Sequence, residues 1–176
     1  LQGDWSSDVC SSDLGKQVFN QGTQWEQEIK DAYPHPTEQM TVRKILVDSS
    51  NLGTIQISQT LSNERNRQWL SAFGFGEKTS LKFPGETKGL LKLARNWQGT
   101  EKFTFAYGYG YAATPIQLVS AVNVIANDGV YIGPKLVTQV VDARGLSTPT
   151  PESPTRRVLS SSTAATMRSQ IGRAHV

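Results

Sequence analysis

Apolar residues recur at helical spacing in the first half of the chain. Over residues 42–47, Val42, Ile45 and Leu46 fall on one face of a helix. Thr41 precedes them, and its hydroxyl can accept a hydrogen bond from one of the free N–H groups that open a helix. This pattern predicts a short helix over residues 42–47.

Two further helices are expected after it. A polar break over residues 49–51 separates the first helix from the second, and Ser62 or Asn63 can cap the third, which ends at Gly74. The apolar positions of these two helices are Leu52, Ile55, Ile57 and Leu61, followed by Trp69, Leu70 and Phe73. We expect the last three to point into the core.

The segment TPIQLVSAVNVIANDG carries the clearest helix signal. Thr114 can cap the helix, and Pro115 occupies the first helical position, where a missing N–H costs nothing. Residues 127–129, Asn-Asp-Gly, can end it. Its apolar residues recur at i, i+4 and i+7, namely Leu118, Val122 and Ile125.

The remaining segments indicate strands and loops. Residues 15–36 mix short β-like pieces with turn residues, and glycine and proline punctuate a loop that begins at Phe73. Residues 130–132 and 136–141 look like the two strands of a hairpin, and a solvated loop over residues 146–155 follows. A last helix begins at Ser162. The pattern predicts an α/β or α+β fold with a helix-rich middle.

Both ends of the chain look foreign to this pattern. DWSSDVCSSDL, residues 4–14, is polar, lacks periodicity and reads as the translation of a common sequencing adapter. IGRAHV, residues 171–176, fits the opposite adapter strand, in which the next codon is a stop. We therefore expect residues 1–14 and 171–176 to be adapter-derived, the first of them disordered, and residues 15–170 to be an internal fragment of a domain.

Composition excludes several classes of function. The 176 residues contain no run of about 20 apolar residues, so a membrane span is not expected. Lys and Arg are scattered and the formal charge is only +3, which argues against nucleic-acid binding. The single cysteine, Cys10, lies in the adapter-like end, so we expect neither a disulfide framework nor a thiolate metal site.

The glycine segment before the long helix resembles a dinucleotide fingerprint. Gly108-x-Gly110-x-x-Ala113 follows a strand-like run and precedes a helix. However, the helix begins only at Thr114-Pro115, after the glycines, and Asp128 lies in a turn rather than at the end of a strand. A nucleotide site is not expected.

Two other short motifs carry less weight. Lys78-Thr79-Ser80 differs by one residue from the Lys-Thr-Gly of serine acyl transferases, where glycine lets the backbone pass close to substrate. His35 stands between two prolines and has no second histidine or cysteine beside it, so a turn residue is the simpler interpretation. The spacing of the acids, including Asp31 and Asp48, favours no glycosidase pair.

The polar break Ser49-Ser50-Asn51 is on its own most simply a helix cap. Its surroundings change this interpretation. TVRKILVDSSNLGTIQIS, then FGFGEKTSLKFPGE, then YGYGYAATPIQLVSAVNVIANDGV resemble, in order and spacing, the transpeptidase domain of class B penicillin-binding proteins. The resemblance covers residues 31–145 and is strongest to the division-specific members.

The resemblance implies a partial penicillin-binding transpeptidase fold, with a helical subdomain and flanking antiparallel strands. The family consists of peptidoglycan D,D-transpeptidases, which β-lactams inhibit and which use Ser-x-x-Lys, Ser-x-Asn and Lys-(Ser/Thr)-Gly motifs. It implies that Ser49 relays protons between the motif lysine and the leaving D-alanine amine. It also implies that the Asn51 amide binds the substrate backbone and helps to hold that lysine.

The aromatic-glycine segment matches the family beside the cleft. By the resemblance, Tyr109 is a candidate wall for the substrate or a β-lactam, and Tyr107, Gly108 and Gly110 belong to the same segment. The alternative is that the aromatic rings pack beneath the site while the glycines permit a tight turn. The sequence leaves both alternatives open.

The sequence departs from the family in two motifs. No serine is followed three residues later by lysine, and neither Lys-Ser-Gly nor Lys-Thr-Gly occurs. We therefore expect the chain alone to be inactive and the longer parent protein to carry the nucleophile. The resemblance implies stem peptides and β-lactams as ligands, a membrane anchor with the domain outside the cytoplasm, and wall-polymerase and division partners.

Two alternatives remain. One is a fragment of a serine β-lactamase or β-lactam sensor of the same fold. The other is a non-catalytic domain that binds cell-wall peptide or sugar through the tyrosine-glycine segment.

Overall fold

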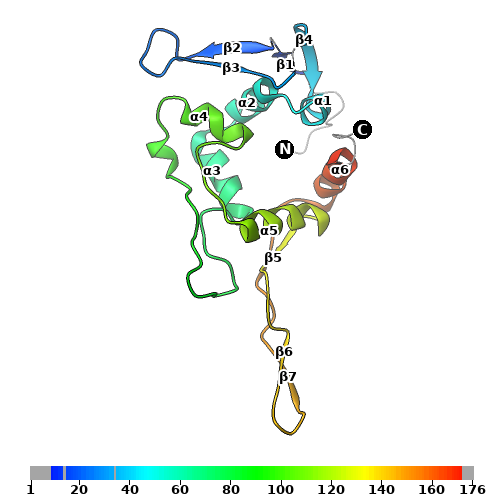
Figure 1. Ribbon diagram of the computed structural model, residues 1–176. Helices are drawn as coiled ribbons and strands as arrows, with labels where there is room; N and C mark the ends of the chain where they lie inside the picture. The colour runs from blue at the N-terminus through cyan, green and yellow to red at the C-terminus, as the bar shows by residue number, and fades with distance from the viewer. Residues whose placement is uncertain (1–8, 14, 34, 172–176) are drawn as a thin grey trace. The chain divides into compact units, whose positions relative to one another are not determined.

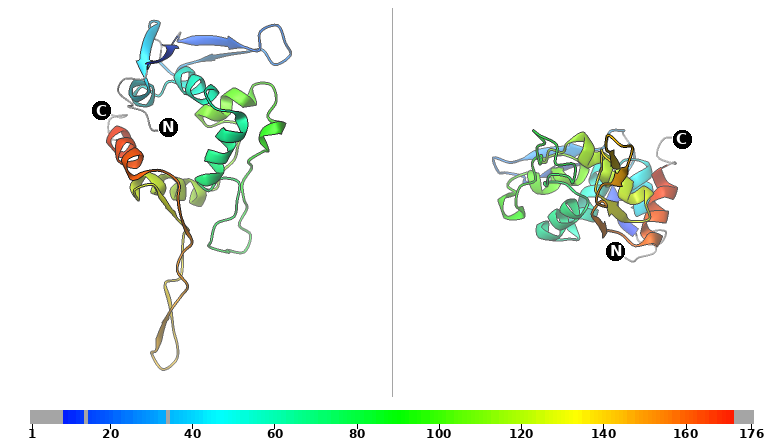
Figure 2. Two further views of the ribbon diagram at one scale, coloured as in Figure 1. Left: turned by 180° about the vertical axis from the view of Figure 1, so that it is seen from behind. Right: turned by 90° about the horizontal axis from the view of Figure 1, so that it is seen from below.

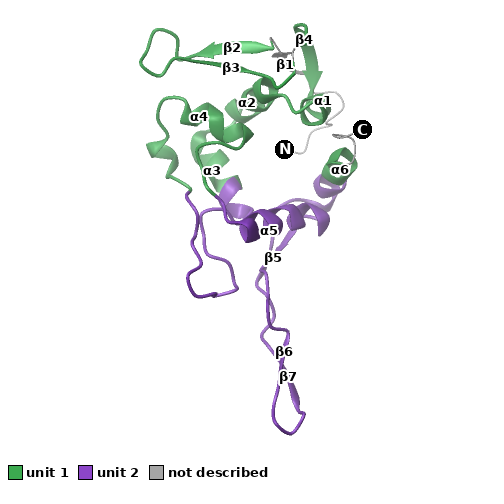
Figure 3. Ribbon diagram, in the orientation of Figure 1, with its two compact units in different colours: residues 1–69, 91–112, 166–176 green, residues 70–90, 113–165 purple. Residues whose placement is uncertain are grey.

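A computed structural model describes residues 9–13, 15–33 and 35–171. The chain divides into two units (Figure 3). Unit 1 is formed by Leu1–Trp69, Leu91–Ala112 and Thr166–Val176, and unit 2 by Leu70–Leu90 and Ala113–Ala165. The adapter-like residues 1–8, 14 and 172–176 lie outside the described part, so their predicted origin stays a prediction.

Two antiparallel strand pairs belong to unit 1 (Figure 1). β1 (Val9–Asp13) pairs with β4 (Glu38–Thr41), with Val9 opposite Thr41, and β2 (Lys16–Phe19) forms a hairpin with β3 (Gln27–Lys30). The predicted β-like pieces of residues 15–36 are confirmed. Residues 9–13, which the sequence places in the adapter-like end, are drawn as β1 paired with β4, and the predicted domain bounds stay a prediction.

The helices of unit 1 begin where the sequence places their caps. α1 spans Val42–Val47, and Lys44 N donates to Thr41 Oγ1 over 3.2 Å. α2 spans Asn51–Gln59 and begins at the last residue of the polar break. Arg65 N donates to Ser62 Oγ at the start of α3, which spans Asn63–Ala72 and continues into unit 2. All three predicted helices are confirmed.

The core of unit 1 fixes α2 beneath the β2–β3 hairpin. Phe19 and Ile29 from the hairpin are buried with Leu52 and Ile55 from α2 and with Phe103. Phe103 belongs to α4 (Glu101–Thr104), and its ring lies 4.5 Å from that of Phe19 between centroids. Each such side chain stabilises the fold by about 1.5–3 kcal/mol when buried. The start of α2, where the polar break lies, is therefore held by the hairpin.

The inward face of α3 differs from the prediction. Trp69, Leu70 and Phe73 are only partly buried, and the buried residue of this helix is Asn66. The Asn66 amide donates to the Ser58 carbonyl over 2.9 Å, which satisfies a polar group that hydrophobic periodicity treats as exposed.

α5 (Pro115–Ala126) in unit 2 begins as predicted but turns a different face inward. Thr114 Oγ1 accepts from Gln117 N while Gln117 Oε1 accepts from Thr114 N, a reciprocal capping box. Leu118 and Val122 are 56% and 54% exposed. The buried residues are Gln117, Ser120, Ala121 and Val124. The Gln117 amide also donates to the carbonyls of Glu77 and Lys88, so its burial is fully compensated.

The strand pairing of unit 2 corrects the predicted hairpin. β5 (Val130–Ile132) pairs with β8 (Thr155–Arg157), and β6 (Gln139–Val141) pairs with β7 (Ser147–Pro149). Beyond β5 the chain runs out as an arm that carries β6 and β7 and then returns, as Figures 1 and 2 show. Gly133 N donates to Pro154 O, which continues the β5–β8 pairing beyond Ile132.

The remaining elements complete the description. Two short 3-10 helices, η1 (Ala94–Asn96) and η2 (Phe105–Tyr107), flank α4 in the sequence. α6 (Ser161–Ile171) starts one residue before the predicted position. The mixed helical and antiparallel architecture agrees with the predicted fold class. No helix in residues 9–13, 15–33 and 35–171 is long and apolar enough to cross a bilayer.

Candidate functional site

The turn between α1 and α2 places Ser49 in a left-handed conformation. Its φ is 57°, and the next residue, Ser50, donates its N–H to the Ile45 carbonyl over 3.0 Å. This bond closes the last turn of α1 as in a Schellman motif, whose left-handed position usually holds glycine. A left-handed non-glycine residue costs about 1–2 kcal/mol, so Ser49 carries backbone strain that glycine would avoid.

Ser50 performs the ordinary helix-capping role in the polar break. It is buried, and its Oγ accepts from Gly53 N over 2.8 Å at the start of α2. The Ser50 carbonyl accepts from Thr54 N, the first bond inside the helix. Because one serine of the trio accounts for the cap, capping does not explain the residues on either side of it.

Ser49 lines a pocket within unit 1. The pocket has a volume of about 530 Å³, and Ser49 is exposed in it. The other lining residues are Asp31, Ala32, Tyr33, His35, Met40, Val47, Asp48 and Ser50. Asn51, Tyr107 and Tyr109 are not among them, so this pocket does not bring Ser49 and the predicted tyrosine wall together.

Asn51 is held against the end of β3. Its Nδ2 donates to the Lys30 carbonyl over 3.0 Å, and its backbone N–H donates to Asp31 Oδ1 over 2.6 Å. The side-chain amide has two N–H donors and one carbonyl, and the bond to Lys30 occupies one of the donors. The predicted contact with a substrate backbone stays a prediction.

The tyrosines of the aromatic-glycine segment differ in their surroundings. Tyr107 ends η2 and packs against the core of unit 1, whereas Tyr109 is 67% exposed. Their rings meet edge to face, 5.5 Å apart between centroids. Gly108, between the two tyrosines, and Gly110, after them, have φ of 100° and 83°, which allow the chain to turn tightly here. Burial, and then the neighbouring Tyr109, raise the pKa of the Tyr107 phenol.

Charged side chains cluster near Ser49. Lys44 Nζ lies 2.6 Å from Asp48 Oδ2 and 3.6 Å from Glu38 Oε1. The hydrogen bond to Asp48 raises the pKa of Lys44, so this lysine stays protonated. Because a cationic amine cannot accept a proton, Lys44 does not serve as the base that a serine nucleophile requires.

Sequence reasoning missed the contact of Asp31 with α2. Asp31 follows β3 directly, and no spacing in the chain distinguished it from the other acids. Its partners lie about twenty residues away in the sequence, at Asn51 and Leu52. An acid that ends a strand was the only local signal, and the pairing itself depends on the tertiary fold.

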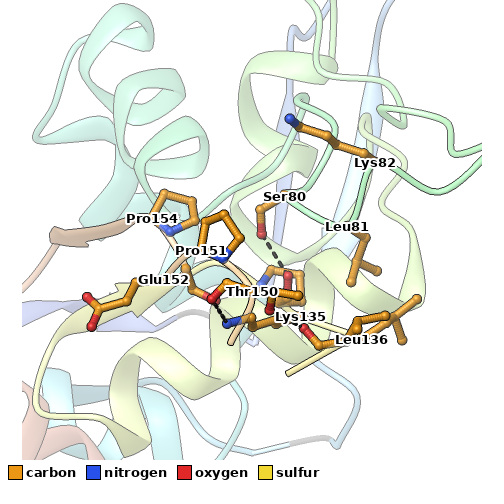
Figure 4. A pocket seen from close by; sticks show the side chains of 12 residues that line it. Ser80, Leu81, Lys82, Lys135, Leu136, Thr150, Pro151, Glu152 and Pro154 are labelled. Carbon is orange, nitrogen blue, oxygen red and sulfur yellow. Dashed lines mark hydrogen bonds between the residues drawn. The ribbon is translucent and has the colours of Figure 1, made fainter. Parts of the chain in front are cut away.

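A second pocket, of about 540 Å³, lies within unit 2 (Figure 4). Ser80 Oγ donates to Pro134 O over 2.7 Å, and Lys135 Nζ donates to Thr150 O over 3.2 Å. Thr79 Oγ1 donates to Glu86 Oε1. The hydroxyls of Lys78-Thr79-Ser80 are thus used in internal bonds, which agrees with its interpretation as an unrelated loop motif. No group of three or more potential metal ligands occurs in the described ranges.

Comparison with known proteins identifies the relatives of this chain. Residues 12–174 match the family described as the penicillin binding protein transpeptidase domain. Penicillin-binding protein PbpB of Mycobacterium tuberculosis is 33% identical over 143 residues, which are 81% of this chain and 21% of that protein.

Solved structures agree with this match. A peptidoglycan synthetase from Bifidobacterium adolescentis has a TM-score of 0.85 at 28% identity, over 95% of this chain and 30% of that one. Penicillin binding protein 3 from M. tuberculosis, complexed with aztreonam, has a TM-score of 0.81 at 30% identity, over 92% of this chain and 35% of that one. The chain spans between 19% and 32% of the length of the curated relatives it matches.

Proposed function

Since the chain belongs to the penicillin-binding protein transpeptidase family, we propose that it is part of a peptidoglycan D,D-transpeptidase that cross-links stem peptides during wall synthesis and division. Curated relatives include peptidoglycan D,D-transpeptidase FtsI of Escherichia coli, 33% identical over 113 residues. The parent protein is the longer polypeptide that would contain this chain together with the nucleophile.

The proposed reaction is acyl transfer in two steps. The nucleophilic serine attacks the carbonyl between the last two D-alanines of a stem peptide, a C–O bond forms, and the C–N bond to the terminal D-alanine breaks. The serine proton passes through the motif lysine and Ser49 to the departing amine. An amine of another strand then attacks the ester, which forms the cross-link and regenerates the serine.

One observation carries the assignment of Ser49. Ser50 alone supplies the helix cap, while Ser49 is kept strained and exposed at a pocket. Strained non-glycine residues persist where the surrounding structure imposes them, and they concentrate at functional sites. The strain supports a role for the Ser49 hydroxyl beyond that of ending α1.

The ligands and surroundings of the parent follow from the same proposal. Stem peptides and β-lactams would bind beside Asn51, with Tyr109 as a wall and with Tyr107, Gly108 and Gly110 shaping that wall. No organic cofactor or metal takes part in the steps proposed. The parent would be anchored in the cell membrane with this domain on the extracytoplasmic side, together with wall-polymerase and division proteins.

Labelling with a fluorescent penicillin tests this function. The gene is recovered beyond both ends of the chain, and its product and the 176-residue chain are each incubated with the reagent. We expect a stable covalent label on the parent, at the serine of an upstream Ser-x-x-Lys, and no label on the chain alone. Release of D-alanine from a pentapeptide donor should accompany it.

Other outcomes decide against the proposal. Rapid turnover of the penicillin indicates a β-lactamase, and a label without D-alanine release indicates a β-lactam sensor. A parent without Ser-x-x-Lys that binds muropeptides unlabelled indicates a non-catalytic wall-binding domain. A labelled 176-residue chain contradicts the assignment of the nucleophile to another segment.

A further inference from the structure

Asp31 is a buried carboxylate whose two oxygens serve different partners. Its side chain is 5% exposed. Oδ1 accepts from Asn51 N over 2.6 Å and from Leu52 N over 3.1 Å, and Oδ2 lies 3.1 Å from His35 Nε2. Burying a carboxylate is costly unless it is paired and hydrogen-bonded, and here donors reach both oxygens.

The contact joins the end of β3 to the start of α2. The first N–H groups of a helix have no partner inside it and carry partial positive charge, which favours a carboxylate. Ser50 satisfies Gly53 N from within the turn, and Asp31, the residue after β3, satisfies the two preceding N–H groups. Ser50 already supplies the local cap of α2. The two bonds to Asp31 therefore attach the start of α2 to the residue that follows β3.

Asn51 is held both by its backbone N–H and by its side-chain amide. The backbone N–H of Asn51 bonds to Asp31, and its side-chain amide bonds to the carbonyl of the preceding residue, Lys30. On the other side of the turn, Ser50 N bonds to the Ile45 carbonyl of α1. Only Asp48, Ser49 and Ser50 lie between the end of α1 and this attachment, so both ends of the strained turn are fixed.

We propose that Asp31 is a positioning residue for acyl transfer, which it serves by holding Asn51 and the left-handed turn at Ser49 in their working geometry. The proposal rests on the proposed transpeptidase function. In this role Asp31 acts through Asn51 and the turn at Ser49 rather than through a bond to substrate. Small displacements of a positioned group lower the rate of the chemical step strongly, by up to about 100-fold for a shift of about 1 Å.

A variant-free experiment on the 176-residue chain tests the contact itself. Isotope-labelled chain is examined by NMR for couplings across hydrogen bonds from the Asn51 and Leu52 amide nitrogens to the Asp31 carboxyl carbon. We expect both couplings. Their absence in the folded chain overturns the attachment, whatever the activity of the parent.

A mutant cycle in the parent tests the positioning role. Asp31→Asn keeps the size of the side chain and removes its charge, and Glu28→Gln on β3 is the matched control, since Glu28 pairs with Lys16. We expect Asp31→Asn to lower the first-order acylation constant with penicillin about 10-fold or more. Glu28→Gln should leave it within about twofold of the wild type.

The decisive comparison places Asp31→Asn in an Asn51→Ala background. Asn51→Ala removes the side-chain amide but keeps the backbone N–H that bonds to Asp31 and the turn at Ser49, so Asp31→Asn should lower the acylation constant by less than it does in the wild-type background. An equal fall in both backgrounds overturns the proposal and indicates a general effect on folding.

Labelling of the parent protein also distinguishes a failure of the proposed transpeptidase function from a failure of the positioning role of Asp31. If Asp31→Asn does not fold, Asp31→Glu replaces it, and an acylation constant equal to that of the wild type overturns the positioning role. A wild-type parent that takes no label refutes the proposed function and, with it, the positioning role. A labelled parent unaffected by Asp31→Asn refutes the positioning role alone.

Discussion

Gly53 of α2 lies so close to Ile45 of α1 that no side chain fits between them. A methyl group at Gly53 would approach Cγ1, Cδ1 and Cγ2 of Ile45 to between 2.6 and 2.9 Å. Ile45 is itself almost completely buried and has no space into which to move. The two helices on either side of the polar break are therefore packed in direct contact through a glycine.

Gly53→Ala should destabilise the chain despite the better helix propensity of alanine. Overpacking a core costs about 1–3 kcal/mol, while alanine gains about 1 kcal/mol over glycine in a helix. We expect the free energy of unfolding in urea to fall by about 1 kcal/mol. In an Ile45→Ala background the same change should stabilise the chain, and equal effects in both backgrounds would disprove the close contact.

Ser49→Gly and Ser49→Ala separate backbone strain from hydroxyl chemistry. Glycine relieves the left-handed strain at φ 57°, and alanine does not. Urea unfolding should show Ser49→Gly to be more stable than Ser49→Ala by about 1 kcal/mol, while both lower acylation of the parent. Equal stabilities would show that the position is not strained.

The two tyrosines should respond differently to truncation. Tyr107 packs against the core, so Tyr107→Ala should lower the free energy of unfolding of the chain by about 2–3 kcal/mol. The exposed Tyr109 should tolerate alanine within about 0.5 kcal/mol, yet Tyr109→Ala should weaken penicillin binding by the parent. Calorimetry and binding titrations measure both, and unchanged binding would remove Tyr109 from the proposed wall.

The loop that follows α3 should loosen in acid through Glu86. Its carboxylate accepts bonds from the Thr79 hydroxyl and backbone N–H, which lower its pKa below the ordinary value of 4.5. Since the folded pKa is depressed, the stabilisation is present above pH 4.5 and is lost as the pH falls through the folded pKa.

The Thr79 amide shift, followed by NMR from neutral pH downward, should report this titration. We expect a midpoint below pH 4.5 in the wild type and no such transition in Glu86→Gln. A midpoint at or above that value would contradict the hydrogen-bonded carboxylate.

Local signals predicted the helix starts, and tertiary contacts decided the rest. Thr41 and Thr114 predicted the starts of α1 and α5 because a capping side chain bonds to a backbone N–H only three residues further along the chain. The hairpin predicted for residues 130–141 was wrong because β5 pairs with β8. The first residue of β8, Thr155, lies twenty-five positions after the first residue of β5, Val130. No local pattern distinguishes these two pairings.

The candidate site was predictable to a similar extent. Ser49 and Asn51 were found through the order of motifs around them, which a single sequence displays. Asp31 was not found, because its contact with Asn51 arises only when the β2–β3 hairpin packs on α2. The buried face of α5 was not predictable for the same reason, since the Gln117 amide bonds to carbonyls of a distant loop.

The most direct measurement of the proposed function is the second-order rate constant of acylation by penicillin in the parent carrying Ser49→Ala. The matched control is Ser62→Ala, which removes an exposed hydroxyl at the start of α3. Loss of a proton relay should lower the constant by about 100-fold in Ser49→Ala and leave the control within about twofold of the wild type. A Ser49→Ala parent that acylates at the wild-type rate would contradict the role of the polar break in catalysis.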